Sequence, residues 1–219
     1  IIEYRIRDTK GKRLVSLSLE SFMNETASES VAPGGGSVSA YLGSLGTALG
    51  SMVANISSHK RGWDERWEEF SSWAEKGKVI QNELLSLVDE DTNAFNMIMK
   101  AFGMPKTSEE DKKERKAAIE EATKNAILVP FKVMEVAFRA YEVIEEMVKE
   151  GNPNSVTDAG VGALAVRSCI KGAYLNVCVN TQGLEDKKFG DEIKAKAAEL
   201  DAQSEQKEKK IIDLVESKL

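Results

Sequence analysis

The chain of 219 residues is long enough for one domain with a sizeable core, and its 42% hydrophobic and 30% charged residues predict a globular protein. The net charge of −6 argues against a nucleic-acid binder, which usually presents a basic face to phosphates. A small anionic ligand held by a few local cations remains compatible with this charge.

Two cysteines, Cys169 and Cys178, lie in a segment that is predicted to be helical. On one helix their separation is about 13 Å, whereas the Cα atoms of a disulfide lie within about 7 Å of each other. The sequence also opens without a basic and then apolar leader. We therefore expect reduced cysteines and a cytoplasmic location.

The N-terminal part of the chain alternates apolar and polar residues over positions 1–17, which predicts an extended arm or at most a short hairpin. We assign residues 1–16 to this N-terminal arm and residues 17–219 to one helical domain. A short amphipathic helix over 19–29 is expected to turn three side chains inward, those of Leu19, Phe22 and Met23.

The segment 31–58 carries no charge and exceeds the roughly 20 residues that a membrane span needs. Its many serines and glycines make it only weakly apolar, so we favour a helix outside the membrane over a membrane span. Its larger apolar residues recur at helical spacing, and Gly43, Gly46 and Gly50 form a second stripe almost without side chains. A glycine inside a helix costs about 1 kcal/mol relative to alanine, and we favour close packing of another helix over ligand contact as the reason.

The rest of the chain is also predicted to be helical. A long helix is expected over 64–102, and a second begins after a cap at Thr107 or Ser108 and is interrupted by Pro130. Further helices are expected at 131–150, from the turn after Gly151 to about 180, and at about 185–218. The fold class is therefore all-α, a multihelical array or bundle of long and short helices.

Several catalytic sites can be excluded from the motifs. The only histidine is His59, and neither HExxH nor paired CxxC is present, so no metal site is expected. PGGGS at 33–37 lacks both the ending of a phosphate-binding P-loop and the preceding strand of a dinucleotide site. It predicts instead a helix start with open backbone N–H groups, which either accepts an anion or carbonyl oxygen or binds nothing. Ser37 is expected either to cap this helix or to face a ligand.

Two pairs of asparagines mark the two ends of the helix that is predicted to end near position 180. Asn152 and Asn154 precede it with Asp158 in its first turn, where caps and dipole compensation are the ordinary explanation. Asn176 and Asn180 share one face and need partners, either a polar heterocycle or the backbone of another helix. Asp158 and Asn176 lie about 27 Å apart on a straight helix, which leaves a long ligand, a broken helix, two sites or two subunits as alternatives.

A third cluster lies in LLSLVDEDTNAF. Asp91 follows Val88 by three positions and precedes Phe95 by four, so its carboxylate is expected on or near the buried face of the helix. Asp89 and Glu90 are expected to be solvated. Asp91 is therefore a better functional candidate than an ordinary surface carboxylate.

Three stretches together resemble the cyclodeaminase/cyclohydrolase family of folate enzymes: PGGGSVSAYLGSLGTALGSMVANIS, VDEDTNAF and GNPNSVTDAGVGALAVRSCIKGAYLNVCVN. The resemblance runs in order from about Leu17 to the C-terminus. It implies an all-α homodimer that acts on one-carbon adducts of tetrahydrofolate as substrates, without a metal or a further cofactor. Two positions depart from the expected pattern: His59, where a small or flexible residue is expected, and Thr157, where a serine is expected.

The resemblance implies two activities: cyclisation of 5-formimidoyl-tetrahydrofolate to the 5,10-methenyl form with loss of ammonia, which we favour, and hydrolysis of the methenyl form to 10-formyl-tetrahydrofolate. Asp158 and Asp91 are the candidates for proton transfer, and one of them could instead orient the pterin. The candidates for substrate binding are Gly34, Gly35, Gly36, Ser37, Asn152, Asn154, Asn176, Asn180 and Lys132. Lysines such as Lys132 suit the anionic glutamate tail, which can be polyglutamylated. A non-catalytic folate-binding or regulatory protein is the alternative of another class.

Overall fold

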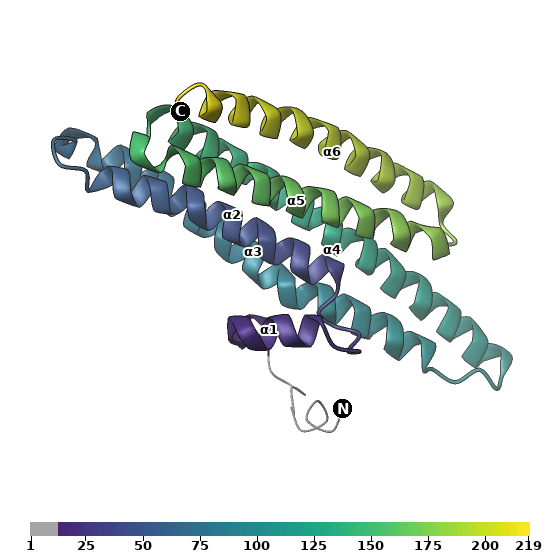
Figure 1. The fold of residues 1–219 in the computed structure, drawn as a ribbon. Coiled ribbons are helices and arrows are strands. Elements are labelled where there is room, and N and C mark those ends of the chain that lie inside the picture. Colours follow the sequence, from purple (N-terminus) through teal and green to yellow (C-terminus); the bar gives the residue numbers. More distant parts are fainter. Residues whose placement is uncertain (1–12) are drawn as a thin grey trace.

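The fold of this protein is known from a computed structural model that describes residues 13–219. Over that range it contains six α-helices and no β-strand, so the all-α prediction is confirmed (Figure 1). The helices are α1 (Leu19–Thr26), α2 (Gly35–Ser58), α3 (Trp67–Phe102), α4 (Glu109–Glu150), α5 (Val156–Asn180) and α6 (Lys187–Glu216). Short 3₁₀ turns lie at Leu14–Ser16, Asp64–Arg66, Pro153–Ser155 and Thr181–Gly183.

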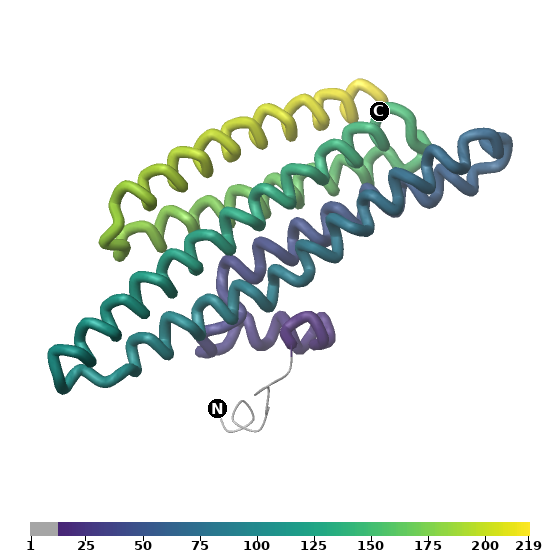
Figure 2. The backbone as a smooth tube through the Cα atoms, turned by 180° about the vertical axis from the view of Figure 1, so that it is seen from behind, coloured from purple at the N-terminus to yellow at the C-terminus, as the bar shows by residue number. Residues whose placement is uncertain are grey.

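The five long helices run alternately up and down as one elongated bundle (Figures 1 and 2). Helix α2 packs on α3 and α5, and α4 lies beneath α2 and α5. Helix α6 covers α5 and α4 on one side of the bundle. The beginning of α2, the end of α5 and the middle parts of α3 and α4 therefore meet in one region, and the beginning of α5 lies at the other end.

The glycine stripe of α2 allows close helix packing, as predicted. A Cβ at Gly43 would lie 2.6 Å from Sγ of Cys169, and a Cβ at Gly46 would lie 2.6 Å from the carbonyl oxygen of Gly162. Gly50 meets Ile144 of α4 in the same way. These contacts bring α5 and α4 against the backbone of α2. Three of the larger apolar side chains of α2, those of Leu45, Met52 and Ile56, are exposed, whereas Val53 is buried in the core.

Helix α4 corrects the prediction that Pro130 interrupts the chain. One helix of 42 residues continues through Pro130, which is itself buried among the buried residues Ile127 and Val133. Tertiary packing of this face stabilises helix on both sides of the proline, a contribution that local propensity does not include. The start of α4 agrees with the prediction, because Ser108 forms a capping box with Asp111.

Helix α1 differs from its prediction in length and in burial. It ends at Thr26, and Leu19 and Met23 are 68% and 63% exposed, so the prediction that they point inward was wrong. Only Phe22 packs closely, with its ring 5.3 Å from that of Tyr41 in α2. Helix α1 lies outside the five-helix bundle (Figure 1), and Phe22 is its residue that packs against the core.

The N-terminal arm lies mostly outside the described residues, but its last part is bound to α3. Arg13 Nε donates to Asp89 Oδ2 at 2.9 Å, and the Leu14 N–H donates to Asp89 Oδ1 at 2.7 Å. Leu14–Ser16 is a 3₁₀ turn rather than an extended strand. The prediction that Asp89 is solvated was therefore wrong, because a segment 75 residues earlier in the chain covers it.

The charged helix α6 is attached through two carboxylates that are themselves buried. Asp201 of α6 accepts hydrogen bonds from Arg167 and Lys171 of α5, both at 2.6 Å. Glu145 of α4 accepts from Lys207 at 3.0 Å and from Lys210 at 3.1 Å, and Lys149 also lies 2.8 Å from it. Ion pairs thus supplement the apolar contacts of α6, whose buried residues include Ala197 and Ile211.

Three further findings concern residues 13–219 alone. No helix there combines the length and the apolar character needed to cross a bilayer. No group of three or more His, Cys, Asp or Glu side chains there is placed to hold a metal ion. Both cysteines are free, with Cys169 buried, as expected from their spacing.

Candidate functional site

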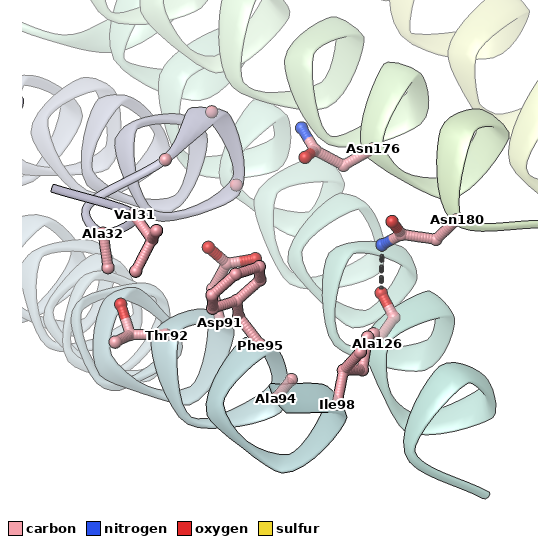
Figure 3. Close-up of a pocket in the computed structure, with 13 residues that line it drawn as sticks. Val31, Ala32, Asp91, Thr92, Ala94, Phe95, Ile98, Ala126, Asn176 and Asn180 are labelled. Carbon is pink, nitrogen blue, oxygen red and sulfur yellow. Dashed lines mark hydrogen bonds between the residues drawn. The ribbon is translucent and has the colours of Figure 1, made fainter. Parts of the chain in front are cut away.

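A small cavity lies where the start of α2 meets α3, α4 and α5 (Figure 3). Its volume is about 130 Å³. Its lining consists of Val31, Ala32, Gly34, Gly35, Gly36, Asp91, Thr92, Ala94, Phe95, Ile98, Ala126, Asn176 and Asn180. Sites for small ligands usually reach several hundred cubic ångströms, about 300 or more, so this cavity has room for only part of a folate.

Asp91 is the carboxylate of this cavity, and it comes from the middle of α3. Ser37 Oγ donates a hydrogen bond of 2.8 Å to Asp91 Oδ2, and Thr92 Oγ1 lies 3.3 Å from the same hydroxyl. Burial raises the pKa of Asp91 above 3.8, and the hydrogen bond from Ser37 opposes that rise in part. A raised pKa brings a carboxyl group closer to the working pH, which makes it better suited to accept and donate a proton in turn.

One of the three glycines at the start of α2, Gly36, permits the close approach of this carboxylate. A Cβ on Gly36 would overlap the carboxylate of Asp91, and one on Gly35 would lie 3.4 Å from Asn176 Nδ2. A Cβ on Gly34 would meet nothing within 4 Å. Gly36 is therefore the position where the absence of a side chain is required, since the first turn of α2 and Asp91 occupy adjacent space.

Asn176 and Asn180 both line the cavity, and both direct their amide nitrogens to backbone carbonyl groups. Asn180 Nδ2 donates to the Ala126 oxygen of α4 at 2.7 Å (Figure 3). Asn176 Nδ2 donates to the Gly172 oxygen of its own helix at 2.9 Å. No hydrogen bond within residues 13–219 uses either Oδ1 atom, so both amides keep a free acceptor for a ligand.

The wall of the cavity that faces the two asparagines is apolar apart from Asp91 and Thr92. Ala94, Phe95 and Ile98 follow one face of α3, and Val31 and Ala32 cover the cavity from the segment before α2 (Figure 3). A wall of apolar groups facing a few oriented acceptors is typical of sites that bind a flat heterocycle with N–H donors on its edge.

Lys132 lies near this region but does not line the cavity. Its ammonium group is half exposed and lies 3.9 Å from Glu90. The prediction that Glu90 is solvated agrees with the 44% exposure of its side chain. Lys132 is thus placed on the surface beside the helix that carries Asp91.

The second group of predicted site residues lies at the opposite end of α5. The Asn152 N–H donates to Ser57 Oγ at 2.8 Å near the end of α2, and the Asn154 N–H donates to Asn152 Oδ1 at 3.2 Å. Asp158 lies in the first turn of α5. Because α5 is unbroken from Val156 to Asn180, the alternative of a broken helix is removed, and the separation of about 27 Å from Asn176 stands.

The two departures from the family pattern also lie away from the cavity. His59 Nδ1 lies 2.8 Å from Ser58 Oγ and 3.0 Å from the Asn55 oxygen, at the end of α2. Thr157 is exposed beside Asp158. Neither position affects the lining of the cavity.

Sequence reasoning missed several parts of the cavity, which are the Ala126 carbonyl group, Thr92, Ile98 and the segment Val31–Ala32. One signal for Ala126 was present in the sequence. Pro130 has no N–H, so the carbonyl four residues earlier loses its helical partner and has to bond elsewhere. The other residues become neighbours only through the packing of α2 on α3.

The comparisons with known proteins all give relatives that are named as cyclodeaminases or as a cyclohydrolase of folate metabolism. A family model described as formiminotransferase-cyclodeaminase matches residues 18–199. The chain is 34% identical over 202 residues to the methenyltetrahydrofolate cyclohydrolase of Methylorubrum extorquens, covering 92% of this chain and 97% of that protein. It is 32% identical over 201 residues to the formimidoyltransferase-cyclodeaminase of Rattus norvegicus, but it spans only 37% of that protein. A solved structure of formiminotetrahydrofolate cyclodeaminase from Thermotoga maritima is similar, with a TM-score of 0.81, 27% identity and coverage of 92% of this chain and 97% of that one.

Proposed function

The chain belongs to the formiminotransferase-cyclodeaminase family, and from this we propose that it cyclises 5-formimidoyl-tetrahydrofolate to 5,10-methenyl-tetrahydrofolate with release of ammonia. The observation that carries the proposal is the cavity built around Asp91, with Ser37 behind the carboxylate and two asparagine acceptors beside it. The solved cyclodeaminase of similar fold supports the same activity.

The proposed reaction needs one proton to move between two nitrogen atoms. N10 attacks the carbon of the protonated formimidoyl group, the N10–C bond forms, and N10 loses its proton. The C–N bond to the terminal nitrogen then breaks, and that nitrogen leaves as ammonia with the added proton, so the positive charge remains on the methenyl product. Asp91 takes the proton from N10 and returns it to the leaving nitrogen, a task that suits a carboxyl group with a raised pKa.

The acceptors of the cavity fit the other groups of this substrate. Oδ1 of Asn176 and Oδ1 of Asn180 can accept from the N–H groups of the pterin edge or from the formimidoyl cation. The open N–H groups at the start of α2, next to Gly36, face the same region and favour negative charge on Asp91 or on the ligand. We assign proton transfer to Asp91 and leave Asp158 as a candidate for orientation or for a second proton transfer.

Hydrolysis of 5,10-methenyl-tetrahydrofolate to the 10-formyl form is the second candidate. It is favoured by the similarity to the cyclohydrolase of Methylorubrum extorquens over nearly the full length of that protein. In this reaction Asp91 would remove a proton from the water that attacks the methenyl carbon, which gives a hydroxyl adduct. The bond from that carbon to N5 would then break as N5 takes the proton back from Asp91, and the hydroxyl proton would be released to leave the formyl group on N10.

One experiment separates these activities. The 5-formimidoyl and 5,10-methenyl substrates are supplied separately, and the absorbance of the methenyl form is followed with the unaltered protein and with Asp91→Asn. Formation of the methenyl form from the first substrate supports the cyclodeaminase, and its consumption supports the cyclohydrolase. Folate binding without either change would support the non-catalytic alternative and contradict both enzymatic proposals.

We also propose a homodimer that joins the exposed apolar faces of α2 and α5. These two helices lie side by side over α4 (Figure 1), and we infer that their exposed apolar residues share one surface. The exposed apolar residues of this surface are Leu45, Met52 and Ile56 of α2 and Val161, Leu164, Leu175 and Val179 of α5. A continuous apolar surface of this kind is typical of a protein–protein interface, and identical subunits most often pair around a two-fold axis.

A two-fold axis near the middle of α5 would place Asp158 of one subunit opposite Asn176 of the other, because the two α5 helices would then run antiparallel. This arrangement supports a site shared by two subunits and would enlarge the small cavity. Mixing Asp91→Asn with Asp158→Asn tests it, since a mixed dimer contains one site free of both changes. We expect partial recovery of activity on mixing. Two variants that stay inactive together, or a monomeric mass of the unaltered protein, would contradict the shared site.

The anionic glutamate tail is assigned to Lys132, which is half exposed beside α3 and makes only a 3.9 Å contact with Glu90. We expect Lys132→Ala to raise KM for a polyglutamylated substrate more than KM for the monoglutamate. Equal changes in both KM values would contradict this assignment. We also propose a cytoplasmic location, which cell fractionation can test.

A further inference from the structure

Pro130 removes one backbone hydrogen bond from the interior of α4. Proline has no N–H, so within an α-helix the carbonyl group four residues earlier is left without its usual donor. Pro130 is buried in the interior of the 42-residue helix α4, and the carbonyl group concerned is that of Ala126. A backbone carbonyl in such a position is stabilised by any donor that reaches it.

Asn180 supplies that donor from another helix. Its Nδ2 lies 2.7 Å from the Ala126 oxygen, although the two residues are 54 positions apart in the chain. Both residues line the cavity, and the hydrogen bond joins its α4 wall to its α5 wall (Figure 3). Asn176 differs, because the Gly172 oxygen that its Nδ2 contacts lies four residues earlier in the same unbroken helix.

The hydrogen bond also determines which end of the Asn180 amide a ligand meets. An asparagine amide can turn to present either its oxygen or its nitrogen. Here the nitrogen is held by the Ala126 oxygen, which can only accept, so the oxygen is left for the ligand. We propose that Pro130, without touching the substrate, is a positioning residue of the folate pocket that fixes Asn180 as a hydrogen-bond acceptor. This inference rests on the proposed function for the identity of the ligand.

The variant Pro130→Ala tests this inference directly, because alanine restores the N–H and favours the helix. The new N–H occupies the Ala126 oxygen, so Asn180 loses its exclusive partner and its amide becomes free to turn. We expect KM or Kd for the tetrahydrofolate substrate to rise about fivefold, the loss typical of one net hydrogen bond, with kcat changed less than twofold. Thermal stability should be unchanged or higher.

The matched control places the same change in a protein that lacks the amide. In the Asn180→Ala background, Pro130→Ala is expected to leave KM unchanged, since no amide remains to be positioned. An equal effect of Pro130→Ala in both backgrounds would mean that the proline acts on the helix as a whole, and the proposal would be wrong.

A measurement without substrate decides the structural half of the inference. The side-chain amide protons of Asn180 should exchange slowly with solvent in the unaltered protein and rapidly in Pro130→Ala, as seen by NMR of 15N-labelled samples. Retained protection in the variant would overturn the proposal. If no folate binds to the unaltered protein, the proposed function fails, but the exchange measurement still decides whether Pro130 positions Asn180.

Discussion

Ser37 Oγ donates a hydrogen bond of 2.8 Å to Asp91 Oδ2, and this contact joins the first turn of α2 to the middle of α3. Ser37 is fully buried, so its hydroxyl has little access to solvent. The contact places the carboxylate at the helix start that the three glycines leave open. Asp91 is therefore a buried carboxyl group that lies close to the backbone of the first turn of α2.

Asp91→Asn is expected to reduce activity by about 10²–10⁴-fold, the range typical of a lost acid–base group, and to change how stability depends on pH. Burial raises the pKa of Asp91 above 3.8, so the folded state binds a proton more tightly than the unfolded state. The stability linked to this group is complete below 3.8 and is lost as pH rises through the raised pKa.

Melting temperatures of the unaltered protein and of Asp91→Asn, measured from about pH 4 to pH 8, test this sign. The variant should lose less stability than the unaltered protein as pH rises, and it should be the more stable of the two at neutral pH. Parallel melting curves across this range would show that burial of Asp91 has no energetic consequence.

Gly36→Ala is expected to displace Asp91, because the new Cβ would overlap its carboxylate. We predict a loss of kcat/KM of about tenfold or more, as small misplacements of a reacting group produce, together with a fold that keeps its helical circular dichroism. The control is Gly183→Ala, where a Cβ meets nothing within 4 Å and the residue does not line the cavity. Similar activities of the two variants would show that activity does not depend on the close contact between Gly36 and the Asp91 carboxylate.

Gly46→Ala is expected to separate α2 from α5, since its Cβ would lie 2.6 Å from the Gly162 carbonyl oxygen and the backbone has to move. The free energy of unfolding should fall by about 1–3 kcal/mol, the usual effect of overpacking. Chemical denaturation measures it. Gly183→Ala serves as the control because no atom lies within 4 Å of its Cβ, and an equal loss there would point to backbone effects instead of packing.

Glu145 is expected to stabilise the contact between α4 and α6 at neutral pH and to lose this effect in acid. The hydrogen bond from Lys149 and those from Lys207 and Lys210 lower the pKa of this buried carboxyl from 4.5 to about 2. Its stabilisation is therefore complete above 4.5 and is lost as pH falls toward 2.

Because the three lysines are partly solvated, we expect this contribution to be no more than about 2 kcal/mol at neutral pH. Denaturation of the unaltered protein and of Glu145→Gln at about pH 7 and about pH 3 should give a difference that shrinks in acid. A difference that is the same at both pH values would mean that Glu145 stabilises through packing and not through charge.

The parts of the fold that could be predicted from the sequence depend on neighbours in the chain. Apolar spacing in α2 and α3, the capping serine at Ser108 and the position of Asp91 between Val88 and Phe95 all rest on contacts three or four residues apart. Helical geometry converts that spacing directly into a shared face. The same reasoning placed Asn176 and Asn180 together and separated both from Asp158.

The sequence by itself thus determined the all-α fold class, the packing role of the α2 glycines and the buried carboxylate. Only the tertiary structure decided that α4 continues through Pro130, that Asp89 binds Arg13, and that Ala126 is the partner of Asn180. These outcomes join residues 54 to 76 positions apart or depend on packing against other helices. Their free energies come from burial and from hydrogen bonds between helices, which no local pattern in the chain contains.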